Sequence, residues 1–203
     1  GMLDAHTVAC VVCRHAEGLV AWDSVYFVQI ALEGYEYEQS RAFFPALPAA
    51  MRYAGRLMFG GPQVTRCAVI LSGLVITNLA FIISAVLLEQ LGIAVLGDAV
   101  VARAAAILYT FNPASVFHSG IYTEPVFAAV SFGGCLALVR GHRNVAAGLF
   151  AATCAVRSNG VLHLIHLAFD FVDATVLPGW RAGVRLWWMR DKSPRGKLSH
   201  HDW

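Results

Sequence analysis

Residues Cys67–Leu88 read CAVILSGLVITNLAFIISAVLL, a run of 22 residues without a charged side chain. At ~1.5 Å per residue, a helix of this length crosses a hydrocarbon core of ~30 Å. The sequence therefore predicts a membrane-spanning helix here. Glu89 and Gln90 close the run, and Gly92 is expected to begin a turn.

The composition of the whole chain is also typical of a membrane protein. Hydrophobic residues make up 58% of the 203 residues, charged residues make up 14%, and the mean hydropathy is +0.60. A soluble domain is usually ~45–50% apolar. A net charge of +2 gives no indication of nucleic-acid binding. We therefore expect an all-α, polytopic integral membrane protein.

Four further apolar runs follow the first span. Asp98 is a suitable N-cap for a helix reaching Phe111, which should end there because the residue before Pro113 is disfavoured in an α-helix. Arg103 inside this run must face a partner or a cavity. The other runs cover residues 126–139, 145–156 and 161–177, the first following Pro125 in a helical first turn. They are short for full spans, so some are expected to be tilted, broken or re-entrant.

Basic residues predict the orientation of these spans. Six Lys and Arg residues lie between Arg181 and Lys197, on the same predicted side as Arg140 and Arg143. Because Lys and Arg accumulate on the cytoplasmic side, that side is predicted to be cytoplasmic. The opposite face then holds polar residues from several separate segments: Asp23, Asn112, Glu124, Arg157 and Asn159.

The five cysteines give little indication of a redox or metal site. Cys10 and Cys13 form a lone CxxC, which is weak evidence for either. Cys67, Cys135 and Cys154 lie in apolar runs and are expected to pack as small hydrophobic side chains. No other cluster of ligand residues suggests a metal.

The Trp22-Asp23 pair precedes an apolar segment that is predicted to be helical to about Leu32 and to stop at Gly34. Asp23 can be read as the N-cap of this helix, with Trp22 as an anchor at the membrane interface. It can also be read as a general base, a carboxylate partly desolvated by its aromatic neighbours. Local sequence favours the first interpretation.

The other polar candidates each have a structural interpretation as well. Residues 41–48, which include Arg41, are typical of an interfacial loop, and Asn112-Pro113 is a helix stop. Glu124 would favour a helix N-terminus through the dipole. Arg157 is either a snorkelling side chain in a turn or a cation for a phosphate group.

Three blocks taken together are more specific than any one of these motifs. They are WDSVYFVQIALEGYEYEQSRAFFPALP at 22–48, FNPASVFHSGIYTEPVFA at 111–128 and AVRSNG at 155–160. Their order and spacing resemble the GPI mannosyltransferase 2 family, integral-membrane glycosyltransferases of the GT-C type. The resemblance covers roughly residues 20–165.

The resemblance implies a multi-pass enzyme of the endoplasmic reticulum membrane with a lumen-facing site. Such an enzyme transfers the second mannose, in α1,6 linkage, from dolichyl-phosphate mannose to the glycosylphosphatidylinositol (GPI) precursor, without a cofactor or metal. It implies catalytic roles for Trp22 and Asp23. The residues it implies in substrate binding are Arg41, Asn112, Pro113, Glu124, Arg157 and Asn159.

The chain also departs from the family pattern. Tyr26 stands where the family usually has His, and family members are about twice as long. Residues 1–66 are expected to hold a degraded first span and a luminal catalytic segment, 67–177 the transmembrane helices and 178–203 a basic cytoplasmic tail, in one membrane domain. Two alternatives stay open: a non-catalytic, truncated membrane protein of this family, or a small transporter with Arg103 and Glu124 along its path.

Overall fold

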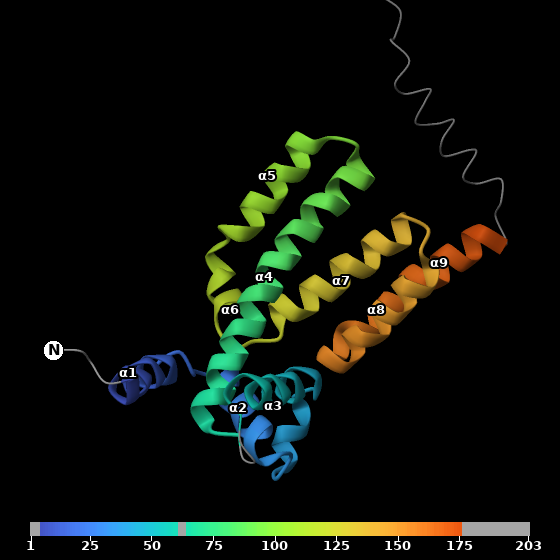
Figure 1. Cartoon of the computed structure of the whole chain (residues 1–203). Helices are drawn as coiled ribbons and strands as arrows, with labels where there is room; N and C mark the ends of the chain where they lie inside the picture. The colour runs from blue at the N-terminus through green and yellow to red at the C-terminus, as the bar shows by residue number, and fades with distance from the viewer. Residues whose placement is uncertain (1–4, 61–63, 176–203) are drawn as a thin grey trace, which may run out of the picture. The chain divides into compact units, whose positions relative to one another are not determined.

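Figure 1 shows the computed structural model, which describes residues 5–60 and 64–175. These residues contain helices and no strand, in agreement with the all-α prediction. The chain divides into two units, Gly1–Val161 and Leu162–Trp203. The helices are α1 (Ala5–Glu17), α2 (Asp23–Glu33), η1 (Glu38–Ala42), α3 (Ala46–Phe59), α4 (Arg66–Leu96), α5 (Ala99–Thr110), η2 (Pro113–Ser115), α6 (Val116–Ser119), α7 (Glu124–Val139), α8 (Arg143–Val156), η3 (Ser158–His163) and α9 (Leu164–Thr175).

Helix α4 is the central element of the first unit, between α5 and α7 (Figure 1). Its first turn is capped by the Thr65 hydroxyl, which accepts a hydrogen bond of 3.2 Å from the backbone N–H of Ala68. The prediction that a turn begins at Gly92 is wrong, because α4 continues to Leu96. A Cβ at Gly92 would lie 2.8 Å from the Cβ of Ala102, so this glycine permits the close approach of α5.

The signals at the ends of the later helices are confirmed. The Asp98 carboxylate accepts hydrogen bonds from the backbone N–H groups of Val100 and Val101, and α5 ends before Asn112-Pro113. Helix α7 has a proline in its first turn, as expected. Arg103 has the partner that its position required, because its Nε lies 3.0 Å from a carboxylate oxygen of Glu89.

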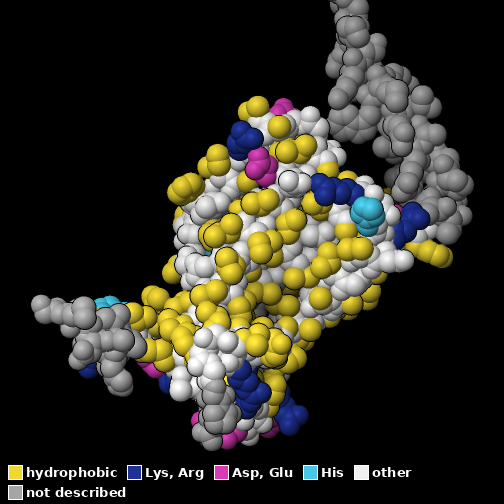
Figure 2. Space-filling view, viewed as in Figure 1, with side chains coloured by type: hydrophobic (Ala, Val, Ile, Leu, Met, Phe, Trp, Pro, Cys, Tyr) yellow, Lys and Arg dark blue, Asp and Glu magenta, His cyan; other side chains and the backbone are white. Residues whose placement is uncertain are grey.

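The described residues contain one helix, α4, that is long and apolar enough to cross a membrane. Helix α5 and the η2–α6 segment are together also long and apolar enough, with a bend of 58° between them. Helices α7 and α8 are apolar but shorter. In Figure 2, charged side chains gather near the two ends of the first unit, and an apolar belt lies between them. Exposed apolar residues on α4 and α5 include Leu79, Ile82, Ile83, Val86, Ile107 and Leu108.

The buried core lies where α2 and α3 pack on the first turns of α4. It includes Phe27, Leu47, Met51, Ile70 and Ile121. Two polar contacts fix α3 in place, since the Ser72 hydroxyl donates to the Met51 carbonyl and the Arg52 guanidinium donates to the last carbonyls of α2. The interfacial loop expected at 41–48 is therefore only partly correct, because residues 46–48 form the first turn of α3 and Leu47 and Pro48 are buried.

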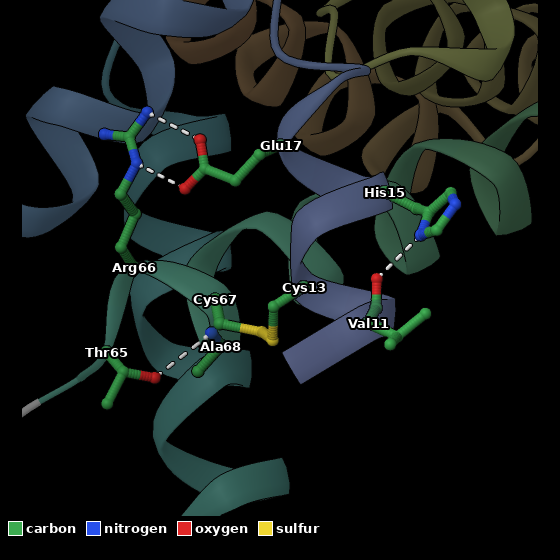
Figure 3. The surroundings of a disulfide bond; sticks show 8 residues. All are labelled: Val11, Cys13, His15, Glu17, Thr65, Arg66, Cys67 and Ala68. Carbon is green, nitrogen blue, oxygen red and sulfur yellow. Dashed lines mark hydrogen bonds and ion pairs between the residues drawn. A yellow bond between two sulfur atoms is a disulfide. The ribbon is translucent and has the colours of Figure 1, made fainter. Parts of the chain in front are cut away.

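A disulfide between Cys13 and Cys67 joins α1 to the first turn of α4, with the two Cα atoms 5.5 Å apart (Figure 3). The prediction that Cys67 packs as a small hydrophobic residue is wrong, and Cys13 pairs outside its CxxC motif. An ion pair of 2.8 Å between Arg66 and Glu17 reinforces the same junction. Cys135 and Cys154 are free and half-buried, as expected.

The disulfide predicts a difference in thiol labelling. The denatured wild-type chain should gain two maleimide labels after reduction, because only then do Cys13 and Cys67 become free thiols. A variant with serine at both positions should gain none. Mass spectrometry of the labelled chain measures this directly. Equal labelling of the wild type before and after reduction would contradict the disulfide.

In the second unit, α9 covers Leu164–Thr175. The helix expected from residue 161 thus begins later, because the 3-10 helix η3 runs through His163. The predicted basic tail, 178–203, lies outside the described residues.

Candidate functional site

A pocket of ≈ 160 Å³ lies among three segments that are far apart in the sequence. The start of α2 contributes Asp23, the start of α7 contributes Glu124, and the end of α8 contributes Arg157. The other lining residues are mostly aromatic or small: Phe27, Ala42, Phe43, Phe44, Tyr122, Thr123, Val156 and Ser158. Of the residues proposed from the sequence, the structure thus brings Asp23, Glu124 and Arg157 together.

Asp23 is the first residue of α2 and does not cap it, which corrects the N-cap interpretation. Trp22 takes the N-cap position, and its side chain makes no capping hydrogen bond. Within the described residues, the Asp23 carboxylate has no hydrogen-bond or ion-pair partner. The carboxylate therefore borders the pocket uncommitted to another described side chain.

Trp22 has a left-handed backbone, with φ of 57°, and its side chain is 79% exposed. A non-glycine residue in a sparsely populated region costs about 1–3 kcal/mol and persists only where its surroundings hold it. Two long-range hydrogen bonds hold this turn. The Ser24 hydroxyl donates to the Ile121 carbonyl (3.1 Å), and the Tyr122 hydroxyl donates to the Ala21 carbonyl (3.1 Å). They fix the start of α2 against the segment that leads into α7.

Arg157 forms an ion pair with Glu124 and donates a hydrogen bond of 3.3 Å to the Thr123 hydroxyl. Both charged side chains are 36% exposed. The interpretation of Arg157 as a snorkelling side chain is therefore wrong, because its guanidinium binds the first turn of α7. Glu124 also lies where the helix dipole favours a negative charge, as the sequence predicted.

Gly160 fixes the backbone that follows Arg157. Its N–H donates to the Arg157 carbonyl, and its own carbonyl accepts a hydrogen bond from the Thr153 hydroxyl. A Cβ at Gly160 would lie 2.5 Å from the Cys154 backbone nitrogen. The chain can therefore fold back on the last turn of α8 only with glycine here.

Gly160→Ala is expected to displace this turn and to destabilise the protein by about 1–3 kcal/mol, since the added methyl group overlaps backbone atoms. A lower midpoint of thermal unfolding in detergent measures the effect. Gly148→Ala is the matched control, because nothing lies within 4 Å of a Cβ at that position in α8. Equal midpoints for the two variants would contradict the packing described here.

An aromatic group forms one wall of the pocket. The Phe43 ring stacks on Tyr26 with 4.7 Å between ring centroids and meets the edge of Phe27 at 5.2 Å. Tyr26 thus supports Phe43 from outside the pocket. The Tyr35 hydroxyl donates to the Phe43 carbonyl (2.8 Å), and burial raises the pKa of this tyrosine, so it remains a neutral donor.

A second, larger pocket of ≈ 450 Å³ adjoins this wall. It is lined by Tyr35, Arg41, Phe43, Phe44 and Pro45, so it shares Phe43 and Phe44 with the first pocket. Arg41 therefore lies in a neighbouring pocket rather than beside Asp23.

The remaining predicted residues do not line either pocket. Asn112 caps the short helix η2 through a hydrogen bond to the Ala114 N–H, next to Pro113. Asn159 is exposed in η3. Trp22 precedes Asp23 in the sequence but does not line the pocket. Their predicted roles stay predictions.

The sequence did not indicate that Phe43, Phe44 and Thr123 belong to the site, although all three lie within the quoted blocks. In the described residues, no group of three or more His, Cys, Asp and Glu side chains is placed to hold a metal ion.

Comparisons with known proteins identify the family of the chain. A family profile described as Mannosyltransferase (PIG-V) matches residues 3–176. The chain belongs to this family. No solved structure matches it significantly.

Curated relatives of this PIG-V family chain carry the names of GPI mannosyltransferases. "GPI alpha-1,6-mannosyltransferase 2" of Mus musculus is 36% identical over 176 residues, covering 83% of this chain and 36% of the relative. The protein of the same name in Homo sapiens is 36% identical, covering 71% and 30%. "GPI mannosyltransferase 2" of Yarrowia lipolytica is 32% identical, covering 85% and 46%. The chain thus spans about a third to a half of the length of these relatives.

Proposed function

We propose that this chain transfers mannose from dolichyl-phosphate mannose to the 6-hydroxyl of a mannose on the GPI precursor, adding the second mannose in α1,6 linkage. The observation that carries the proposal is the convergence of Asp23 with the Glu124–Arg157 pair in one pocket. These residues come from three blocks that resemble GPI mannosyltransferases, and the relatives' names point to the same reaction.

In the proposed reaction, Asp23 takes the proton of the acceptor hydroxyl. The oxygen then attacks the anomeric carbon of the donor, and the bond from that carbon to the phosphate oxygen breaks. Dolichyl phosphate leaves with the bonding electrons. A single displacement converts the β-linked donor to an α-linked product, so the enzyme is inverting. The activated sugar arrives on its lipid, and the proposal includes no cofactor or metal.

The Glu124–Arg157 pair has a positioning role in this proposal. Because the guanidinium is held by Glu124 and Thr123, it forms a fixed wall of the pocket that Asp23 borders rather than a free cation. A fixed wall orients the acceptor sugar, and orientation of reactants is one of the larger contributions to catalysis.

We also propose a GT-C-like, multi-pass arrangement in the endoplasmic reticulum membrane with the pocket facing the lumen. The disulfide supports this orientation, because it lies at the same end of α4 as the core that carries α2. Disulfides form in oxidising compartments such as the lumen. The candidate spans and the exposed apolar belt support membrane insertion.

The test is complementation. Cells that lack the second GPI mannosyltransferase should regain GPI-anchored proteins at their surface when they express the wild-type chain. Flow cytometry with an antibody to an anchored protein measures this. Absence of recovery, with the chain inserted in the membrane, would contradict the proposal.

Absence of recovery would favour a second candidate, a non-catalytic membrane protein of this family. The transporter alternative loses support, since Arg103 and Glu124 are each engaged in a separate ion pair.

A further inference from the structure

Two arginines, Arg41 and Arg157, line the pockets described above, and they differ in their surroundings. Arg157 is paired with Glu124, so its charge is already compensated. Arg41 is exposed, at the end of η1, and has no hydrogen-bond or ion-pair partner within the described residues. The positive charge of Arg41 is therefore available to bind an anion.

The pocket beside Arg41 has the chemistry of an amphiphilic anion site. Its other lining residues are Tyr35, Phe43, Phe44 and Pro45, which offer aromatic and apolar surface. Glu36 and Glu38 belong to the same segment but do not line the pocket. A planar guanidinium binds phosphate oxygens through paired, charge-assisted hydrogen bonds, and the apolar walls suit a hydrocarbon chain.

This pocket adjoins the pocket that Asp23 borders. Phe43 and Phe44 line both this pocket and the pocket that Asp23 borders. Phe43 is fixed by Tyr26 and Phe27, and its carbonyl by Tyr35, so the shared wall is preorganised. A phosphate at Arg41 would therefore lie in a pocket that adjoins the one bordered by Asp23.

We propose, on the basis of the function proposed above, that the Arg41 pocket binds the phosphate and the first isoprene units of the lipid-linked donor, while the Asp23 pocket takes the sugar. Arg41 then stabilises the phosphate that departs, while Arg157, paired with Glu124, orients the acceptor sugar. The two arginines thus have different roles.

Binding to the purified chain in nanodiscs tests this inference without requiring mannose transfer. The probe is citronellyl phosphate, a short isoprenoid monophosphate, with citronellol and inorganic phosphate as separate arms. Arg41→Gln should raise the dissociation constant for citronellyl phosphate roughly tenfold or more, because a charge-assisted bond is lost. Arg41→Lys, which keeps the charge, should recover part of the affinity.

Two further variants make the test specific. Arg56→Gln removes another exposed arginine, in α3, and should leave binding unchanged. Phe44→Leu should weaken binding of citronellyl phosphate but leave inorganic phosphate unaffected. Citronellol, which lacks the phosphate, should bind much more weakly than its phosphate ester and show no dependence on Arg41.

The outcomes separate this inference from the proposed function. Unchanged affinity in Arg41→Gln, or equal losses in Arg41→Gln and Arg56→Gln, would overturn the Arg41 site even if the wild type transfers mannose. Equal affinity for inorganic phosphate and citronellyl phosphate would identify a free-phosphate site and overturn it too. Arg41-dependent binding without any transfer would support the site and reject only the proposed reaction.

Discussion

Asp23→Asn should abolish mannose transfer while leaving the chain folded and inserted. Asparagine has the same shape as aspartate and is tolerated in a helical first turn, but it cannot take a proton from the acceptor hydroxyl. General-base assistance is worth about 10²–10⁴-fold in rate, so the variant should lose at least that lower factor. Transfer of radiolabelled mannose in membranes that contain the variant measures the loss.

Glu33→Gln is the matched control for this variant. Glu33 lies at the other end of α2, is exposed, and has its carboxylate hydrogen-bonded to Gln29 within the same helix. Removing its charge should leave transfer unchanged. Near-normal transfer by Asp23→Asn, or equal losses in both variants, would remove Asp23 from the general-base role.

Glu124→Gln and Arg157→Gln should each reduce transfer by about 10²-fold. Each substitution leaves the remaining side chain without its partner, so this wall of the pocket loses its fixed geometry. Small displacements of positioning groups have effects of this size on rate. Initial rates of mannose transfer at saturating donor measure the loss for each variant.

The double variant distinguishes a pair from two independent residues. Groups that act through one contact show non-additive effects, so Glu124→Gln with Arg157→Gln should cost less than the product of the single losses. Arg103→Gln is the control, since its ion pair with Glu89 lies at the other end of α4. Fully multiplicative losses would show that the two side chains act separately.

The parts of the fold that local signals determine could be predicted from the sequence. The start of α5 follows from the capping carboxylate of Asp98, and its end follows from Pro113. Helix α2 stops at Gly34 as predicted. In each case a residue acts on backbone groups within a few positions of itself, so its neighbours in sequence suffice.

Features that depend on contacts between distant segments could not be predicted. Glycine is common in turns, but Gly92 lies within α4, where it allows the close packing of α5. The partner of Cys13 lies 54 residues away, and a cysteine pairing is not encoded locally. Asp23 was read as a cap because the tight turn at Trp22, held from Ile121 and Tyr122, has no signal nearby.

The candidate site, too, could be predicted from the sequence only in part. Topological reasoning placed Asp23, Glu124 and Arg157 on one face of the bilayer, and the structure adds that they share one pocket. The pairing of Arg157 with Glu124 required the packing of α7 on α8, where Gly134 meets the Phe150 ring. This pairing distinguishes Arg157 from Arg41, which has no such partner within the described residues.

The most direct measurement uses the purified wild-type chain in liposomes, with radiolabelled dolichyl-phosphate mannose and a GPI precursor that carries one mannose. The account predicts a product with a second mannose in α1,6 linkage, formed together with an equal amount of dolichyl phosphate. A chain that is folded and inserted but forms neither product would contradict the account.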